Sequence, residues 1–113
     1  MELIREVHDG VVVVTAAEPR IDAAVAIRFK DRMRELTQDA ANRVILDLST
    51  VDFIDSSGLG AIVAALKQLP PGRKLELAAL TPTVERVFRL TRMDSVFVIH
   101  ADVEAGLAQT SVQ

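Results

Sequence analysis

The chain has 113 residues, half of them apolar and 26% charged, which is the composition of a globular protein long enough for one domain with its own core. The absence of cysteine excludes disulfides and thiolate metal sites, and only two histidines are present, so no bound metal or cofactor is expected. The net charge of -3 mixes both signs, and tyrosine and tryptophan are absent, which argues against direct nucleic-acid binding.

The amino-terminal residues do not have the pattern of an export signal. Met1 to Glu6 include acidic charge where a secretory signal has a basic start and an apolar stretch. No later apolar run is as long as a membrane span. We therefore expect a cytoplasmic protein without a membrane span, with a single domain over residues 1–113.

The first elements predicted are a β-hairpin and a helix. Val11 to Thr15 is a run of β-branched residues that follows a shorter apolar stretch and a turn ending at Gly10, as in a hairpin. From Asp22 the spacing becomes helical, and Asp22 suits the N-cap of this helix. The apolar residues of its buried face are Val25, Phe29, Met33 and Leu36.

The middle of the chain predicts a buried strand followed by a strand-to-helix corner. Val44 to Leu48 is a nearly continuous apolar run, as expected for a central strand covered on both faces. After Asp55 comes Ser56-Ser57-Gly58-Leu59-Gly60, and apolar residues then recur at helical spacing up to Leu69. The serines therefore lie where a helix begins.

The carboxyl-terminal half predicts further alternation of strands and helices. A strand at Lys74 to Leu77 follows Pro70-Pro71-Gly72, and Thr81-Pro82 forms an N-cap and N1 pair for the next helix. A strand at Val96 to Ile99 and a helix at Val103 to Ala108 complete the pattern, with a frayed tail over residues 109–113. The expected class is α/β, with a mixed sheet and an amino-terminal hairpin packed against about four helices.

The corner from Asp55 to Gly60 is the segment best suited to chemistry. It places hydroxyl groups beside the first amide groups of a helix, where an added phosphate is stabilised. Gly58 and Gly60 remove side chains there, which would let another protein approach Ser56. The alternative is that Ser56 or Asp55 caps the helix and the glycines only permit a tight corner.

Enzymatic interpretations of this corner lack the required residues. Gly58-Leu59-Gly60 has no third glycine of a dinucleotide fingerprint, and no P-loop or Gly-x-Ser-x-Gly elbow occurs. His8 and His100 fall near strand edges or turns, where a surface role is expected rather than that of a catalytic base. Asp47, Asp52 and Asp55 allow a weak magnesium site, although solvated loop carboxylates explain them more simply. We therefore do not expect an enzyme.

Two stretches resemble the STAS domain, specifically the bacterial anti-sigma factor antagonists. The first is Val44 to Gly60, VILDLSTVDFIDSSGLG. The second is Thr81 to Met93, TPTVERVFRLTRM, which is similar to the family's Ser/Thr-Pro-x-Val-x-Arg-x-Phe helix. The two occur in the family's order, and the resemblance covers nearly the whole chain.

This resemblance implies a phosphorylation switch. In the family, the unmodified antagonist binds an anti-sigma factor that is also a serine kinase of the GHKL type, and so frees a sigma factor for transcription. Phosphorylation by that kinase releases the antagonist, and a serine phosphatase restores it. The phosphoacceptor falls on Ser56, and the implied partner surface comprises Asp22, Asp55, Ser56, Ser57, Gly58, Leu59 and Gly60.

Two features leave the partner open. Pro19-Arg20-Ile21-Asp22 stands where many members have Gly-Glu-hydrophobic-Asp, so Arg20 replaces an acidic side chain at the expected rim of the interface. An alternative function is a scaffold subunit of a stressosome-like or transporter-associated complex, in which the serine is never modified.

Overall fold

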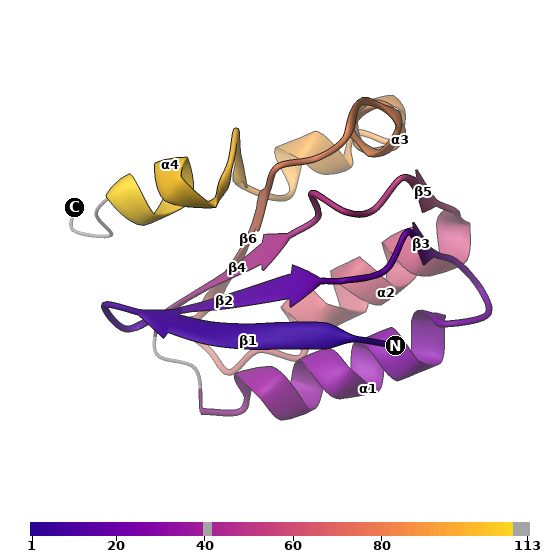
Figure 1. Ribbon diagram of the computed structural model, residues 1–113. Helices are drawn as coiled ribbons and strands as arrows, with labels where there is room; N and C mark the ends of the chain where they lie inside the picture. The colour runs from indigo at the N-terminus through magenta and orange to yellow at the C-terminus, as the bar shows by residue number, and fades with distance from the viewer. Residues whose placement is uncertain (40–41, 110–113) are drawn as a thin grey trace.

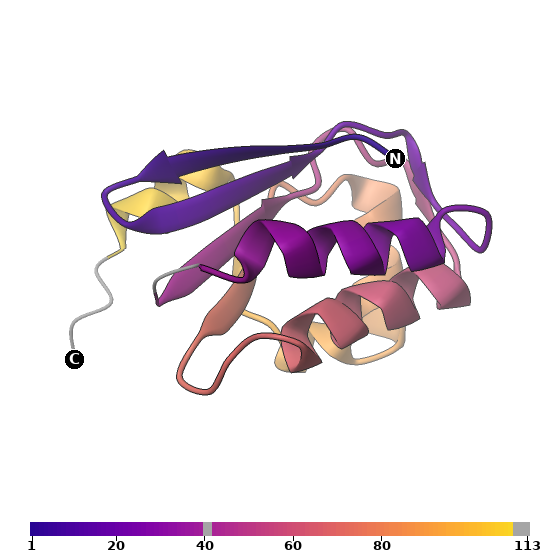
Figure 2. The same cartoon turned by 90° about the horizontal axis from the view of Figure 1, so that it is seen from below.

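The computed structural model describes residues 1–39 and 42–109 (Figure 1). A five-stranded mixed sheet has the order β1-β2-β4-β6-β7. Helices α1 (Ala26–Thr37) and α2 (Ser56–Lys67) cover one face, and α4 (Val103–Ala108) covers part of the other (Figures 1 and 2). The expected α/β class with a mixed sheet is confirmed. Of the tail predicted from Gln109 onward, residues 110–113 lie outside the described residues.

The amino-terminal hairpin forms as predicted. Strands β1 (Leu3–His8) and β2 (Val11–Ala16) are antiparallel, and His8 pairs with Val11. The two residues between them, Asp9 and Gly10, have φ angles of 52° and 82°. Positive φ at both central positions is the geometry of a type I′ turn, whose twist matches that of the flanking strands.

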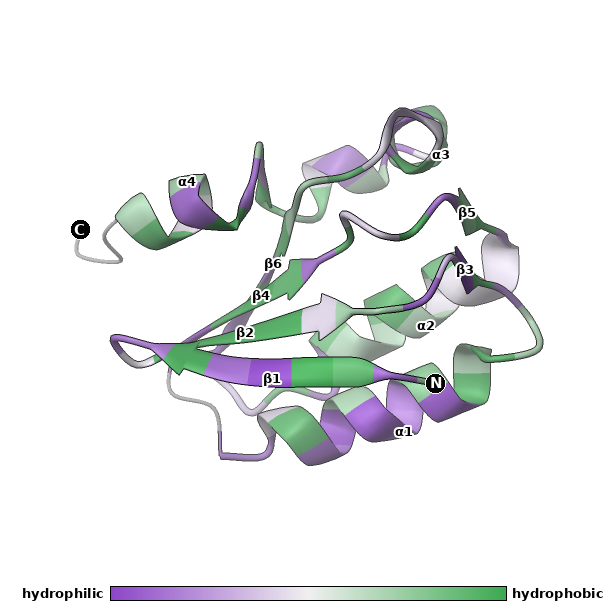
Figure 3. Cartoon of the chain, in the orientation of Figure 1, coloured by the Kyte–Doolittle hydropathy of each residue, from purple (hydrophilic) through white to green (hydrophobic). Residues whose placement is uncertain are grey.

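The central strands are parallel and buried. β4 (Arg43–Asp47) lies between β2 and β6 (Lys74–Ala78), and Val44, Ile45 and Leu46 are fully buried. Figure 3 shows the hydrophobic colouring of β2 and the hydrophilic residues along the outer side of α1. The core on the α1 and α2 side is the larger one. On the opposite face, Val103 and Leu107 of α4 pack on Val13, Ile45 and Ala78.

The predicted last strand is wrong in its bounds. β7 comprises only Ile99–His100, and it follows helix α3 (Pro82–Leu90) and the 3-10 turn η1 (Met93–Ser95). Val96 and Val98 are about half exposed, whereas Phe97 is buried with its ring edge-on to Phe88 at 6.0 Å. Phe97 therefore anchors the connection at residues 96–98 to the core, and pairing in β7 begins at Ile99.

Helix α1 begins later than predicted, and Asp22 is not its N-cap. The Asp22 side chain accepts a hydrogen bond from the Ala24 amide at 3.1 Å, and the Asp22 carbonyl accepts one from Val25 at 3.0 Å. These bonds close a turn ahead of the helix, and Val25 occupies the N-cap position without a side-chain cap. Aspartate favours such local turns as strongly as it favours caps, so its sequence position could not separate the two.

A second, very short sheet was not predicted. β3 (Arg20–Ile21) and β5 (Phe53–Ile54) pair in parallel, with Arg20 opposite Phe53 and Ile21 opposite Ile54. Both isoleucines are buried, at 0% and 4% exposure. This pairing brings the segment before α1 beside the segment before α2.

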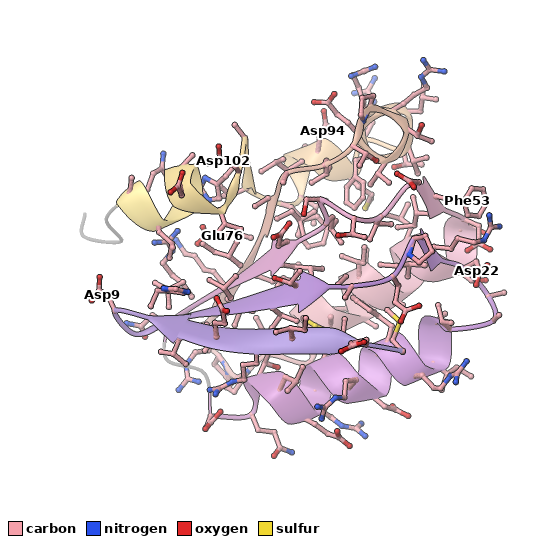
Figure 4. The ribbon with its side chains drawn as sticks, viewed as in Figure 1. Asp9, Asp22, Phe53, Glu76, Asp94 and Asp102 are labelled. Atoms are coloured by element: carbon pink, nitrogen blue, oxygen red, sulfur yellow. The ribbon has the colours of Figure 1, made fainter. Side chains whose placement is uncertain are left out.

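A buried ion network attaches α4 to the sheet. The Arg43 guanidinium donates to both carboxylate oxygens of Glu76 at 2.8 and 2.6 Å, and also to the carbonyls of Gly106 and Gln109. His100 Nε2 lies 2.7 Å from Glu76 Oε1, so the surface role expected for His100 is wrong. Burial alone would raise the pKa of Glu76, but its hydrogen bonds from Arg43 and His100 lower it overall. Glu76 is labelled beneath α4 in Figure 4.

In the part of the chain that the structure describes, no helix combines the length and the apolar composition needed to cross a membrane.

Candidate functional site

The candidate site lies where the short β3–β5 sheet leads into two helices. Because Ile21 pairs with Ile54, the next residues along each strand, Asp22 and Asp55, become neighbours. Helices α1 and α2 then run side by side, with their amino ends at the same end of the molecule (Figures 1 and 2). The topology therefore brings the segment before α1 next to the segment before α2, which the sequence predicted separately.

Asp55 holds this corner together. One carboxylate oxygen, Oδ1, accepts the Gly58 amide at 2.8 Å as the N-cap of α2, and the other, Oδ2, accepts the Ala23 amide at 3.1 Å. The hydrogen bond from Gly58 is the main reason that the pKa of Asp55 is lowered, with Ala23 adding to it against a smaller opposing effect of desolvation. The side chain therefore bridges, as a carboxylate, the start of α2 and the turn that precedes α1.

Ser56 is the first residue of α2 and is exposed, as predicted. Within residues 1–39 and 42–109, no group forms a hydrogen bond with its hydroxyl. Of the two capping candidates left open by the sequence, Asp55 is the cap. The Ser56 hydroxyl is consequently available to another molecule without cost to the helix.

The two glycines of the corner have different roles. A Cβ on Gly58 would lie 1.9 Å from the Ile21 carbonyl oxygen, so a side chain is excluded by the chain's own backbone. The expectation that Gly58 opens the surface to a partner is therefore wrong, because Gly58 is buried and supports internal packing. A Cβ on Gly60 would meet no atom within 4 Å. Only Gly60 fits the expected open approach.

The remaining residues of the corner divide between surface and core. Ser57 is exposed and, with Gly60, lines a groove between α1 and α2. Leu59 is partly buried against the main core, and its amide donates to the Asp55 carbonyl at 2.9 Å. Leu59 therefore belongs mainly to the helix and its packing.

A cation stacked on an aromatic ring forms the rim of the site. Arg20 lies 4.2 Å over the centre of the Phe53 ring, and its Nε is 3.2 Å from Asp22 Oδ2. The Phe53 side chain retains 36% exposure, and Figure 4 shows Phe53 and Asp22 at the same end of the molecule. The sequence did not single out Phe53. The one sequence feature that could have indicated a role for Phe53 is an aromatic residue in a segment rich in polar and acidic residues.

The acidic residues near the corner do not gather. Asp47 accepts the Ser49 amide at 2.9 Å in its own turn, whereas Asp55 uses one oxygen at the start of α2 and the other at the turn before α1. Among the residues that the structure describes, no three acidic or histidine side chains come together as metal ligands. The weak magnesium site allowed by the sequence therefore has no geometric support.

Comparison with known proteins gives one consistent family. A family model described as STAS domain matches residues 2–106. BtrV of Bordetella bronchiseptica, named as a candidate anti-sigma factor antagonist, is 28% identical over 109 residues, which cover 96% of this chain and 93% of BtrV. The anti-sigma-F factor antagonist RsfB of Mycobacterium tuberculosis is 25% identical and the match covers 88% of this chain and 81% of RsfB.

Solved structures agree with these sequence matches. The crystal structure of an anti-sigma factor antagonist from Mycobacterium paratuberculosis has a TM-score of 0.84 at 27% identity, covering 94% of this chain and 90% of that one. The phosphorylated form of SpoIIAA from Bacillus has a TM-score of 0.67 at 20% identity, covering 94% and 96%. The second likeness shows that SpoIIAA shares the fold.

Proposed function

The chain belongs to the STAS domain family, and we propose that it is an anti-sigma factor antagonist whose binding to its partner is switched off by phosphorylation of Ser56. The partner is an anti-sigma factor that is also a serine kinase of the GHKL type, and a separate serine phosphatase reverses the modification. The proposal places the chain in the cytoplasm, where it acts by binding rather than by catalysis.

The observation that carries the proposal is the exposed hydroxyl of Ser56 at the first position of α2, which forms no hydrogen bond with the residues that the structure describes. Asp55 supplies the cap that the helix needs, so modification of Ser56 leaves this cap in place. Ser56 is also exposed, so another protein can reach it. A phosphoacceptor needs this combination of accessibility and structural independence.

The acidic environment of Ser56 explains how a phosphate would disrupt binding. Asp55, the residue before Ser56, already places a carboxylate there, whereas Asp22 is paired with Arg20. A phosphate adds a charge of about -1.5 to -2 at neutral pH, and it must be desolvated if the partner covers it. A loss of about 3 kcal/mol weakens binding more than a hundredfold, which empties a moderately saturated complex.

The fold itself is compatible with such a modification. SpoIIAA from Bacillus shares the fold, with TM-scores of 0.66 and 0.67, and has been solved in both unphosphorylated and phosphorylated forms. In the present chain, the positive end of α2 favours an anion at its first turn. We therefore expect phosphorylation to change the surface and leave the architecture intact.

The test is a binding measurement with purified anti-sigma factor kinases from the host genome, with and without ATP. Wild type should bind without ATP and dissociate after phosphate transfer, whereas Ser56→Ala should stay bound. Ser56→Asp should bind poorly while its circular dichroism spectrum and melting temperature match those of wild type. If no kinase binds or modifies the wild-type chain, the antagonist function is refuted. Stable binding without phosphate transfer would favour the scaffold role instead.

A further inference from the structure

We propose that the groove between α1 and α2 is the docking site for the kinase that modifies Ser56, and that Gly60 is a glycine because the docked segment packs against it. The inference rests on the proposed function and adds a second surface to it. The kinase would then recognise this chain beside the serine, on the outer surfaces of two helices.

The groove adjoins the phosphoacceptor corner. It has a volume of about 200 Å³ and begins beside Ser57, the residue after Ser56. Its floor is made of small residues of both helices, including Ala26, Gly60 and Ala64. Figure 2 shows the two helices side by side on the face away from α4. A segment of a kinase that holds Ser56 in its active site would lie directly over this surface.

Gly60 has no structural requirement for glycine. It lies inside α2, its φ is not positive, and a Cβ there would meet no described atom within 4 Å outside its own stretch of helix. Glycine inside a helix is less stable than alanine because it loses more backbone entropy on folding. Gly58 differs, because the Ile21 carbonyl excludes any side chain. The fold therefore explains Gly58, and contact with another molecule explains Gly60.

The rim of the groove indicates the chemistry of the occupant. Ile27 is 70% exposed, an apolar side chain left in water at the groove edge. Lys30 also lines the groove and forms no ion pair with any residue in the described ranges. Among the arginines of α1, by contrast, Arg32 pairs with Glu35 and Arg34 with Asp31. An apolar side chain of the partner packed on Ile27 would remove it from water, and a carboxylate of the partner beside Lys30 would form an ion pair with it.

Charge favours a kinase over a second copy of this chain. A second copy packed symmetrically on the groove would bring another Lys30 to the interface, and among the described residues that line the groove none is acidic. A partner segment with one apolar and one acidic residue complements the groove without leaving a charge unpaired. We therefore assign the groove to the kinase.

The test combines stability with binding. Gly60→Ala should raise the melting temperature by about 4 °C, since helix propensity improves and nothing clashes. The same variant should bind the purified kinase about tenfold more weakly, because the methyl group occupies the groove.

A matched pair of variants tests the rim of the groove, since Ile27 and Leu90 are exposed to similar extents, at 70% and 75%. Ile27→Ala should also weaken binding by about tenfold, and Leu90→Ala, which lies outside the groove, should not.

The outcomes separate this inference from the function on which it rests. If wild type binds and is phosphorylated on Ser56 but Gly60→Ala and Ile27→Ala bind equally well, the groove is not the docking site and the antagonist function stands. A fall in the melting temperature of Gly60→Ala would also overturn the inference, because the glycine would then be structural. If wild type itself neither binds nor is modified, both proposals fail.

A further variant tests the charge at the rim. Lys30→Glu should lower the affinity for the kinase more at low salt than at high salt, because a carboxylate of the kinase is the expected partner of Lys30.

Discussion

Replacing Gly58 by alanine adds one methyl group where the start of α2 meets β3. The new Cβ would lie 1.9 Å from the Ile21 carbonyl oxygen and 3.0 Å from Cγ1 of Ile54, whereas real Cβ contacts are essentially never below 3.0 Å. Removing this clash requires a backbone segment to shift by about 1 Å, because rotating a side chain cannot move the carbonyl oxygen. The Ile21 carbonyl also accepts the Asp55 amide at 3.4 Å, so the shift disturbs the short sheet.

The magnitude follows from opposing contributions. Overpacking costs about 1–3 kcal/mol, and a clash with backbone belongs at the upper end of that range. A weakened hydrogen bond between Asp55 and Ile21 adds about 1 kcal/mol, while the better helix propensity of alanine returns about 1 kcal/mol. The free energy of unfolding should therefore fall by about 2–3 kcal/mol, which lowers the melting temperature by about 10 °C.

Urea denaturation followed by circular dichroism measures this change, with Gly60→Ala as the control in the same helix. Both variants gain the same methyl group and the same propensity, so their difference isolates the contact with Ile21. Gly58→Ala should be the less stable by about 3–4 kcal/mol. Equal stability of the two variants would show that β3 does not pack on α2 as described.

Two further predictions concern the charged groups. Glu76→Gln should lower the free energy of unfolding by about 3 kcal/mol at pH 7, because it leaves Arg43 buried without its carboxylate. The pKa of Glu76 is lowered in the folded state, so wild type should lose this stabilisation as the pH falls below about 4.3. Urea midpoints of the two proteins should therefore converge in acid, and a constant gap would contradict the network. Asp55→Ala should lower the urea midpoint at pH 7, with a smaller effect at acid pH, since the lowered pKa of Asp55 means that its contribution disappears on protonation. An unchanged midpoint at pH 7 would mean that Asp55 does not hold the start of α2 against the turn that precedes α1.

Much of the fold could be predicted because the relevant signals are local. Asp9-Gly10 between two β-branched or apolar runs specifies a tight hairpin, and Asp55-Ser56 ahead of a helical pattern specifies where α2 begins. The continuous apolar run at Val44 to Leu48 identified the central strand. In each case, the residues that determine the element are neighbours in sequence.

What could not be predicted depends on contacts between distant segments. Two-residue strands such as β3 and β5 have no periodicity, so only their mutual pairing defines them. The difference between Gly58 and Gly60 is set by the Ile21 carbonyl, which the chain brings in from before α1. His100 is buried because Glu76 and Arg43 offer it a charged partner beneath α4. No local pattern around these residues carries that information.

Phosphopeptide mapping tests the assignment of Ser56 as the phosphoacceptor. The wild-type chain, Ser56→Ala and Ser57→Ala are each incubated with a purified anti-sigma factor kinase and ATP, then digested and analysed by mass spectrometry. Phosphate is expected on Ser56 in wild type and in Ser57→Ala, and none is expected in Ser56→Ala. Phosphate on Ser57 alone, or undiminished phosphorylation of Ser56→Ala, would contradict it.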